Sequence, residues 1–232
     1  MSFKIFNHLG SFLFLAATIF LIVTTVSAPV ANSFGLMTVT LPEDVKGSSV
    51  VFGSFGYCIK DGARNGDDLC SDRHIGYNPA ELMRNLTDVS FGDYEEDTTE
   101  ALTRVMVLHP VCVALCFLTF LISFLSSTVI GSVISSGMAL LSFLITGIAI
   151  ISDFVLFTII RKNVNSEKDG GNAYFSSALW TALVAEICLL FGMIIVLLAC
   201  CTNRMHKRRA AAKAEQTSIG APAPKKKFWQ RK

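Results

Sequence analysis

The feature that most constrains the fold is a stretch of 47 residues, from Met106 to Ser152, that contains no Lys, Arg, Asp or Glu. A bilayer crossing takes about 20 apolar residues, so a run of this length predicts two membrane spans and a turn. Only 16% of the residues are charged, whereas a soluble domain has about a quarter. These observations exclude a soluble enzyme, a nucleic-acid-binding domain and a disordered regulator as descriptions of the whole chain.

Four segments are long and apolar enough to cross a bilayer, and they predict spans at 9–28, 107–127, 137–160 and 177–201. All four are expected to be helices, because lipid offers no hydrogen-bond partner to a free backbone N–H or C=O group. The short, hydroxyl-rich segment 128–136 is predicted to be a turn. The predicted fold class is an all-α membrane protein, a four-transmembrane-helix bundle.

The first span has an alternative interpretation as a cleavable signal peptide. Lys4, the apolar run that follows it and the small residues Val26-Ser27-Ala28 are typical of such a peptide. The apolar run from Leu9 to Val26 has 18 residues, however, which is longer than the roughly 7–15 that are usual. Pro29 would also follow the cut directly. These two features favour a retained span.

Charge predicts the orientation of the chain. Ten Lys or Arg residues and one acidic residue lie in 202–232, whereas 29–105 carries six basic and thirteen acidic residues. The positive-inside rule places 202–232 in the cytoplasm, and four spans return 1–8 to the same side. The loops 29–106 and 161–176 then face outward, although Arg161 and Lys162 argue mildly against this. We therefore expect a multi-pass protein with both termini in the cytoplasm.

The seven cysteines divide by their predicted location. Cys58 and Cys70 lie in the outer loop, in an oxidising compartment, and are predicted to form a disulfide that contributes about 3 kcal/mol to stability. A zinc site is the weaker alternative, because His74 would bring the number of ligands only to three. The cysteines within the spans are expected to be small packing residues. They are Cys112, Cys116 and Cys188.

The outer loop is predicted to be partly folded. Met37–Leu41 and Ser48–Tyr57 are rich in β-branched residues, so two or three strands are expected to form a small extracellular β-sheet pinned by the disulfide. Asn78-Pro79 predicts the start of a short helix that runs to residue 84. The acidic stretch 91–100 is expected to be flexible.

Two kinds of covalent modification are predicted. Asn85-Leu86-Thr87 is a glycosylation sequon within the outer loop, which makes Asn85 a candidate site for a glycan. Cys200 and Cys201 end the fourth span at the depth where cysteines are palmitoylated, so both are candidates for acylation.

A short motif in the outer loop resembles a known family. Residues 52–58 read Phe-Gly-Ser-Phe-Gly-Tyr-Cys, and a second cysteine and an Ile-Gly-Tyr sequence follow. Together with four spans, a large first outer loop and a short second one, this motif resembles the fungal PalI-type family of claudin-like four-span proteins. The residues that carry the resemblance are Phe52, Gly53, Phe55, Gly56, Tyr57, Cys58, Cys70, Ile75, Gly76 and Tyr77.

The resemblance implies a claudin-like arrangement in the plasma membrane. It also implies a role in ambient-pH sensing or in organising membrane microdomains, such as eisosomes, at the cell cortex. Claudins carry Trp in the motif where Phe52 and Phe55 stand here, so tight-junction behaviour is not implied. The tail 202–232 is also shorter than the tail of some family members.

Asp153 and Glu186 are the only acidic residues within the predicted spans. Counting 1.5 Å per residue puts both roughly 12–14 Å below the outer end of the bundle, where they could face each other. An acid inside a span is a functional candidate, and such a pair would suit a pH-responsive element. The alternative is that both carboxyls bond neighbouring helices and only hold the bundle together. His109 and Pro110 are expected to be an interfacial residue and a helix-start proline.

The tail carries two basic clusters that are predicted to contact anionic lipids of the inner leaflet. The first follows the fourth span and would gain about 1 kcal/mol per basic residue, although a stop-transfer signal explains it equally well. The second places two aromatic residues among cations, as in peripheral membrane contacts, and its alternative is a solvated tail. The clusters are Arg204, Lys207, Arg208 and Arg209, then Lys225, Lys226, Lys227, Phe228 and Trp229.

Two function classes remain. The sequence contains no lipase-type serine elbow, phosphate loop or His-Glu-x-x-His motif, so we expect no enzyme and no cofactor. The first class is a membrane-domain organiser or accessory subunit of a signalling complex, whose partners are the lipid bilayer, membrane proteins or further copies of itself, and not nucleic acid. The alternative is a small ion- or proton-coupled transporter or channel that uses Asp153 and Glu186. A transporter should line several helices with polar residues, and the first two spans offer only hydroxyls and thiols.

Overall fold

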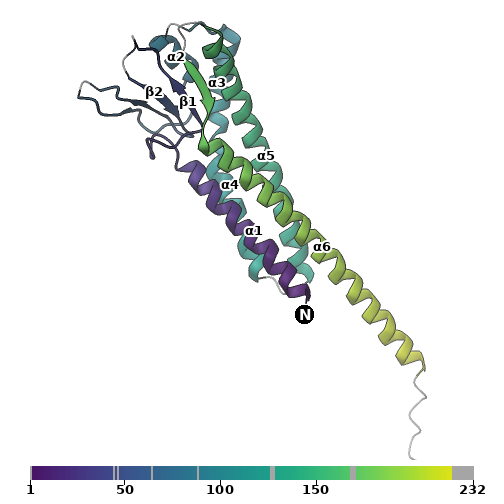
Figure 1. The fold of residues 1–232 in the computed structure, drawn as a ribbon. Helices are drawn as coiled ribbons and strands as arrows, with labels where there is room; N and C mark the ends of the chain where they lie inside the picture. Colours follow the sequence, from purple (N-terminus) through teal and green to yellow (C-terminus); the bar gives the residue numbers. More distant parts are fainter. Residues whose placement is uncertain are drawn as a thin grey trace, which may run out of the picture.

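A computed structural model of the chain describes residues 2–43, 45, 47–63, 65–87, 89–125, 129–167 and 171–220. Four long helices form a bundle, and a small sheet with two short helices covers one end of it (Figure 1). The elements in chain order are α1 (Ser2–Thr25), β1 (Met37–Thr40), β2 (Ser49–Phe52), β3 (Tyr57–Lys60), β4 (Leu69–Cys70), α2 (Pro79–Thr87), α3 (Asp93–Val105), α4 (Leu108–Leu125), α5 (Val129–Ser166), β5 (Asn172–Phe175) and α6 (Ser177–Gly220).

The bundle confirms the predicted fold class. Four helical segments are long and apolar enough to cross a membrane: His8–Thr25, Asp93–Leu125, Val133–Ser166 and Ser177–Ala199. Both α1 and α5 pack against α4 and α6, so the four helices form a ring. The outward side of α5 carries a stripe of exposed apolar residues, as expected of a helix that faces lipid. The stripe is Leu141, Leu144, Ile148, Ile151 and Val155.

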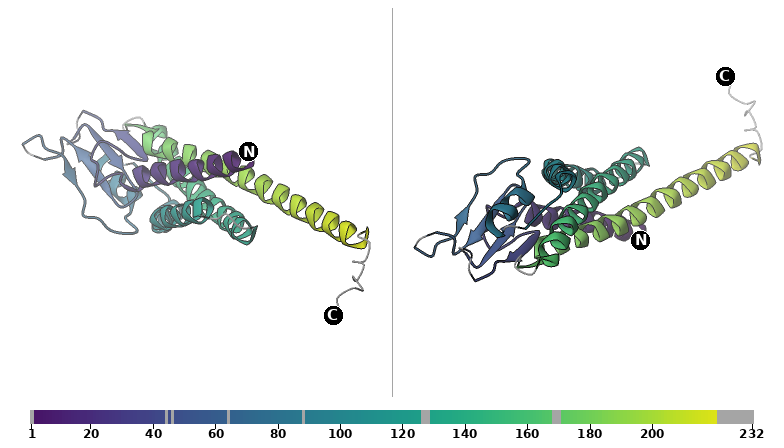
Figure 2. Two further views of the ribbon diagram at one scale, coloured as in Figure 1. Left: turned by 90° about the horizontal axis from the view of Figure 1, so that it is seen from below. Right: turned by 90° about the horizontal axis from the view of Figure 1, so that it is seen from above.

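The helices continue beyond the predicted spans. The segment 128–136 was predicted to be a turn, but from Val129 onward it belongs to α5, so this prediction is wrong. α6 has 44 residues, about 66 Å at 1.5 Å per residue, whereas the hydrocarbon of a bilayer is about 30 Å thick. It therefore projects from the bundle at the end opposite the sheet, and α1 begins at that same end (Figures 1 and 2).

The sheet has five antiparallel strands in the order β4-β3-β2-β1-β5, rather than the two or three expected. The additional edge strand, β5, comes from the second outer loop and pairs with β1, for example Val39 with Ala173. The Asn165 side chain of α5 covers the outer edge of β5. Its amide donates to the Ala173 carbonyl (3.2 Å), and its carbonyl accepts from the Ala173 N–H (2.7 Å). The two outer loops are thus joined into one sheet.

The sheet is held on the bundle by an apolar cluster. Met37, Val39 and Phe52 of the sheet bury their side chains together with Leu156 and Phe157 of α5. Burial of apolar surface of this kind is the main stabilising contribution to a fold. The cluster therefore fixes the sheet at one end of the helix bundle rather than leaving it on a free loop.

Two short helices complete the outer part. α2 confirms the helix predicted after Asn78-Pro79. The stretch 91–100 was expected to be flexible, but most of it forms α3, so this prediction is wrong. Acidic residues in the first turn stabilise a helix through its dipole. Glu96 also forms an ion pair with Arg84 of α2, at 2.7 Å. Thr99 and Thr103 give α3 a buried face.

Candidate functional site

The family-like motif forms the β2–β3 turn, and this turn lies directly against the exit of α1. Phe52 pairs with Tyr57, and the Gly53 N–H donates to the Gly56 carbonyl (2.8 Å). A Cβ atom on Gly53 would lie 2.0 Å from the Ala28 carbonyl oxygen and 2.6 Å from the Ala28 nitrogen. Only glycine fits there, because both obstructing atoms belong to the backbone.

Three further hydrogen bonds hold the turn against α1 and against the segment that follows β4. The Ser54 N–H donates to Ser27 Oγ (3.0 Å), and the Ser54 hydroxyl donates to the Thr24 carbonyl (3.3 Å). The Tyr77 hydroxyl donates to the Gly53 carbonyl (2.8 Å). We call the residues Ser27, Ala28, Gly53, Ser54 and Tyr77 the motif clamp. The clamp joins three segments that are distant in sequence.

An aromatic cluster surrounds the clamp. The rings of Phe52 and Tyr77 are parallel, with centroids 6.4 Å apart, and Tyr57 packs at 6.2 Å from Tyr77. Tyr77 is buried, and its carbonyl accepts from the Thr103 hydroxyl of α3 (2.7 Å). Burial, and next the nearby charge of Asp153, raise the pKa of the Tyr77 hydroxyl. Tyr77 therefore stays a neutral hydrogen-bond donor to the clamp.

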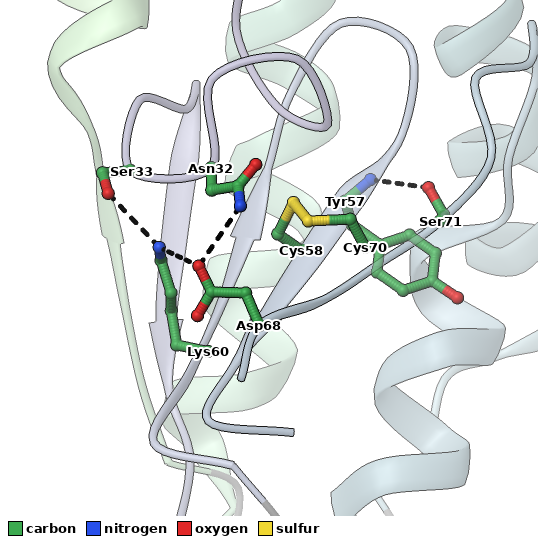
Figure 3. Close-up of a disulfide and its surroundings, with 8 residues drawn as sticks. All are labelled: Asn32, Ser33, Tyr57, Cys58, Lys60, Asp68, Cys70 and Ser71. Atoms are coloured by element: carbon green, nitrogen blue, oxygen red, sulfur yellow. Dashed lines mark hydrogen bonds and ion pairs between the residues drawn. A yellow bond between two sulfur atoms is a disulfide. The ribbon is translucent and has the colours of Figure 1, made fainter. Parts of the chain in front are cut away.

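The predicted Cys58–Cys70 disulfide is present, with the two cysteines 12 residues apart (Figure 3). It joins β3 to the edge strand β4, which has only two residues. Beside it, Lys60 forms an ion pair with Asp68 at 2.6 Å. The hydrogen bond from Lys60, against the opposing effect of burial, holds the pKa of Asp68 below its ordinary value. The Tyr57 N–H also donates to Ser71 Oγ (3.1 Å).

The other motif residues have separate roles. Phe55 is half-buried, and its carbonyl accepts from the His74 N–H (3.2 Å). Ile75 is 57% exposed. Gly76 has a φ of +76°, in the left-handed region that favours glycine. Only Tyr77 of the Ile-Gly-Tyr sequence enters the clamp.

The structure places Asn85 on the exposed surface of the last turn of α2. This position leaves the amide accessible to an attached sugar, and glycosylation of Asn85 stays a prediction.

Asp153 and Glu186 do not pair with each other, which corrects the proposed arrangement. Asp153 is 1% exposed, and its Oδ2 lies 3.1 Å from Nε2 of His109 on α4. The carboxyl of Glu186 lies instead against Gly147, where a Cβ would be 3.1 Å from its Oε1. Gly147 is six residues before Asp153, which corresponds to about 9 Å along α5.

His109 is a site residue that sequence reasoning missed. It was expected at the membrane interface, but it is 1% exposed, with its Nδ1 3.1 Å from the Met106 carbonyl. The available signal was periodicity, because His109 shares a spacing of three or four residues with Cys112 and Cys116. Such spacing places all three on one face of the helix.

The tail is described only in part. Cys201 is exposed, and the backbone of Arg204, Lys207, Arg208 and Arg209 continues α6. The side chains of these four residues and of Cys200 lie outside the described part of the chain. The residues Lys225, Lys226, Lys227, Phe228 and Trp229 also lie outside it. Lipid contact and acylation therefore stay predictions.

Within the described part of the chain, no three His, Cys, Asp or Glu side chains lie together in a group that could hold a metal ion.

Comparison with known proteins gives one informative result. No curated protein matches the chain. The model of the SUR7/PalI family, however, matches residues 4–192. This range contains the motif clamp, both outer loops, nearly all of α1, all of α4 and α5, and the first part of α6. Since the match covers well over half of the sequence, the chain belongs to the SUR7/PalI family of membrane proteins.

Proposed function

We propose that this protein is a non-enzymatic organiser of the plasma membrane, or an accessory subunit of a signalling complex there. The observation that supports this most directly is that the outer sheet is held rigidly on the helix bundle. Strands from both outer loops share it, and the motif clamp and the apolar cluster join it to α1, α5 and α6. A surface fixed in this way keeps one orientation relative to the membrane, as a docking platform for neighbouring proteins requires.

Membership of the family supports the same class of function. The resemblance implies either a contribution to ambient-pH sensing or the organisation of microdomains such as eisosomes at the cell cortex. Both roles rest on lateral contacts with lipids and proteins, and the bundle offers apolar outward faces for such contacts. We favour lateral organisation, because it requires a sheet that is fixed on the bundle and does not require a conformational change.

The proposed topology places both termini in the cytoplasm and the sheet outside. Two observations support it: the ten basic residues in 202–232 and the position of the start of α1 and the end of α6 opposite the sheet (Figure 2). A disulfide outside the cell also agrees with an oxidising environment. In sealed, right-side-out cells, external protease should leave a C-terminal tag intact. Removal of the tag would contradict the four-span topology.

The function itself is tested by cross-linking in intact cells, followed by purification through a tag on the C-terminal tail. We expect defined cross-linked species, containing either partner proteins or further copies of the chain. Asn165→Ala, which frees the edge of β5, should reduce their yield at equal surface level. The matched control is Asn172→Ala, because Asn172 is an exposed residue of the same strand. Exclusively monomeric protein in wild-type cells would contradict the proposal.

The alternative function is ion- or proton-coupled transport through the bundle. One observation favours it, namely that Asp153, His109 and part of Glu186 are buried among the helices. Uptake of protons into vesicles that contain the purified protein, faster than into protein-free vesicles, would support transport. Uptake equal to that of protein-free vesicles would leave the organiser as the function.

A further inference from the structure

The starting observation is the buried side of α4. Along its whole length α4 turns polar or sulfur-containing side chains toward the interior of the bundle, at intervals of three or four residues. This spacing makes them a single stripe on one face of the helix. Its members are His109, Cys112, Cys116, Thr119 and Ser123.

Three levels of this stripe have polar partners on neighbouring helices. One partner is a carboxyl, and two are hydroxyls, so at these levels polar side chains of two helices meet. The pairs are His109–Asp153 at 3.1 Å, Thr119–Ser142 at 3.0 Å and Ser11–Ser123 at 2.8 Å.

The level between these pairs is different. Thr146 of α5 is 1% exposed and lies close to the thiols of Cys112 and Cys116. The carboxyl of Glu186 lies beside the adjacent residue, Gly147. Thr146 Oγ1 and Glu186 Oε2 are both buried, and apart from the weakly bonding thiols beside Thr146 neither has a hydrogen-bond partner among the described residues. Two unsatisfied oxygens at one level of an apolar bundle are costly unless a further molecule bonds them.

We propose that Glu186, Thr146, Cys112 and Cys116 form an internal site that binds water carrying an exchangeable proton. The groups match this ligand, because a buried water makes two to four hydrogen bonds. The hydroxyl and the carboxyl each accept or donate, and the thiols are weak donors. A bound Ca²⁺ would need six to eight oxygen ligands, whereas the side chains here supply three oxygens.

The site lies within reach of a second titratable pair. His109 lies three residues before Cys112 on the buried face of α4, so the His109–Asp153 pair forms the neighbouring level of the bundle. The titratable groups that face the site are therefore Cys112 and Cys116 from α4 and Asp153 with His109 from the neighbouring level. The bound water passes a proton to the Glu186 carboxylate and takes it back. Each transfer to or from Glu186 changes the charge of that carboxyl by one unit.

The first test uses the direction of a stability change in the purified full-length protein. Thr146→Val removes the hydroxyl without changing the shape of the side chain. If Thr146 and Glu186 share a water, this variant leaves Glu186 short of a partner, and the thermal midpoint should fall by about 2–4 °C. The control is Thr18→Val, because Thr18 is equally buried but bonds the Phe14 carbonyl within its own helix (2.8 Å). A midpoint for Thr146→Val at or above that of wild type would overturn the proposal.

The second test follows the carboxyl itself by infrared difference spectroscopy between wild type and Glu186→Gln. We expect the Glu186 band to shift when H₂O is replaced by D₂O, and to shift again in Thr146→Val but not in Thr18→Val. Thr146→Ser, which keeps the hydroxyl, should restore the wild-type band. A Glu186 band that is insensitive to D₂O, or the same in Thr146→Val and wild type, would also overturn the proposal.

Discussion

The outer sheet and the helix bundle bury different kinds of side chain. Where the sheet meets the helices, the interior is made of hydrocarbon and aromatic groups such as Phe52, Met83 and Leu156. Within the bundle, α4 turns His109 and Thr119 inward, while its exposed positions carry residues such as Val111 and Leu118. The bundle therefore buries a stripe of polar side chains beside its own apolar cluster, whereas the interior under the sheet is mainly apolar.

The difference follows from the two solvents. In water, burial of apolar surface is favourable and directs such residues inward. Lipid is as apolar as the side chains, so helices in a bilayer associate through close packing and hydrogen bonds. A buried polar residue in the outer part is thus an exception that needs its own explanation. In the bundle it identifies the face that a helix turns toward its neighbours.

The largest effect is expected from breaking the His109–Asp153 pair. His109→Leu leaves the Asp153 carboxyl buried without its partner, and removal of one member of a buried ion pair costs roughly 3–5 kcal/mol. We expect a loss of about 3 kcal/mol, measured as the thermal midpoint of the purified protein. The same change in the outer apolar cluster would have no such consequence, because no charge is left behind there.

The double variant His109→Leu with Asp153→Leu is the control for that prediction. Two leucines remove both polar groups together, so much of the lost stability should return. If the two single effects instead add up in the double variant, the two side chains do not act as a pair. Buried polar contacts would then matter less to the bundle than the contrast with the sheet implies.

Glycine positions provide the next test, because an added Cβ meets backbone atoms at Gly53 and open space at Gly137. Gly53→Ala places a Cβ 2.0 Å from the backbone of Ala28, and overpacking of this kind costs about 2–3 kcal/mol. We expect reduced delivery to the cell surface and a lower thermal midpoint. Gly137→Ala meets no atom within 4 Å and lies in a helix, so it should stabilise by about 0.5–1 kcal/mol. Equal behaviour of the two variants would contradict the motif clamp.

These contrasts also explain which parts of the structure the sequence could predict. The four spans follow from apolar length and missing charge, which are local properties. The disulfide was predictable because Cys58 and Cys70 are the two cysteines of the outer loop. The short helix after Asn78-Pro79 has a local start signal. In each case the physical cause lies within a few residues of the feature.

The missed features depend on contacts between distant segments. Strand β5 exists because it pairs with β1, some 135 residues earlier in the chain. The helix α3 has an acidic sequence, and its contacts to Arg84 and Asn163 come from two other helices. His109 was assigned to the interface because its partner, Asp153, lies on another helix. A single sequence does not reveal which residues of two such distant segments lie opposite each other.

The smallest effect is expected at the water-exposed ion pair of Lys60 and Asp68. The hydrogen bond from Lys60 lowers the pKa of Asp68 in the folded state, so the unfolded state binds this proton more readily. Stability from the pair is therefore fully present above about pH 4, the ordinary range of an aspartate pKa, and is lost as pH falls through the lower folded value. Asp68→Asn should lower the thermal midpoint slightly at pH 7, and the difference in midpoint from wild type should disappear in acid.

Asp72→Asn is the matched control, since Asp72 is an exposed aspartate beside the same disulfide, and this variant should change the midpoint little at either pH. A gap for Asp68→Asn that persists unchanged at acid pH would show that the carboxylate charge is not what stabilises this part of the sheet.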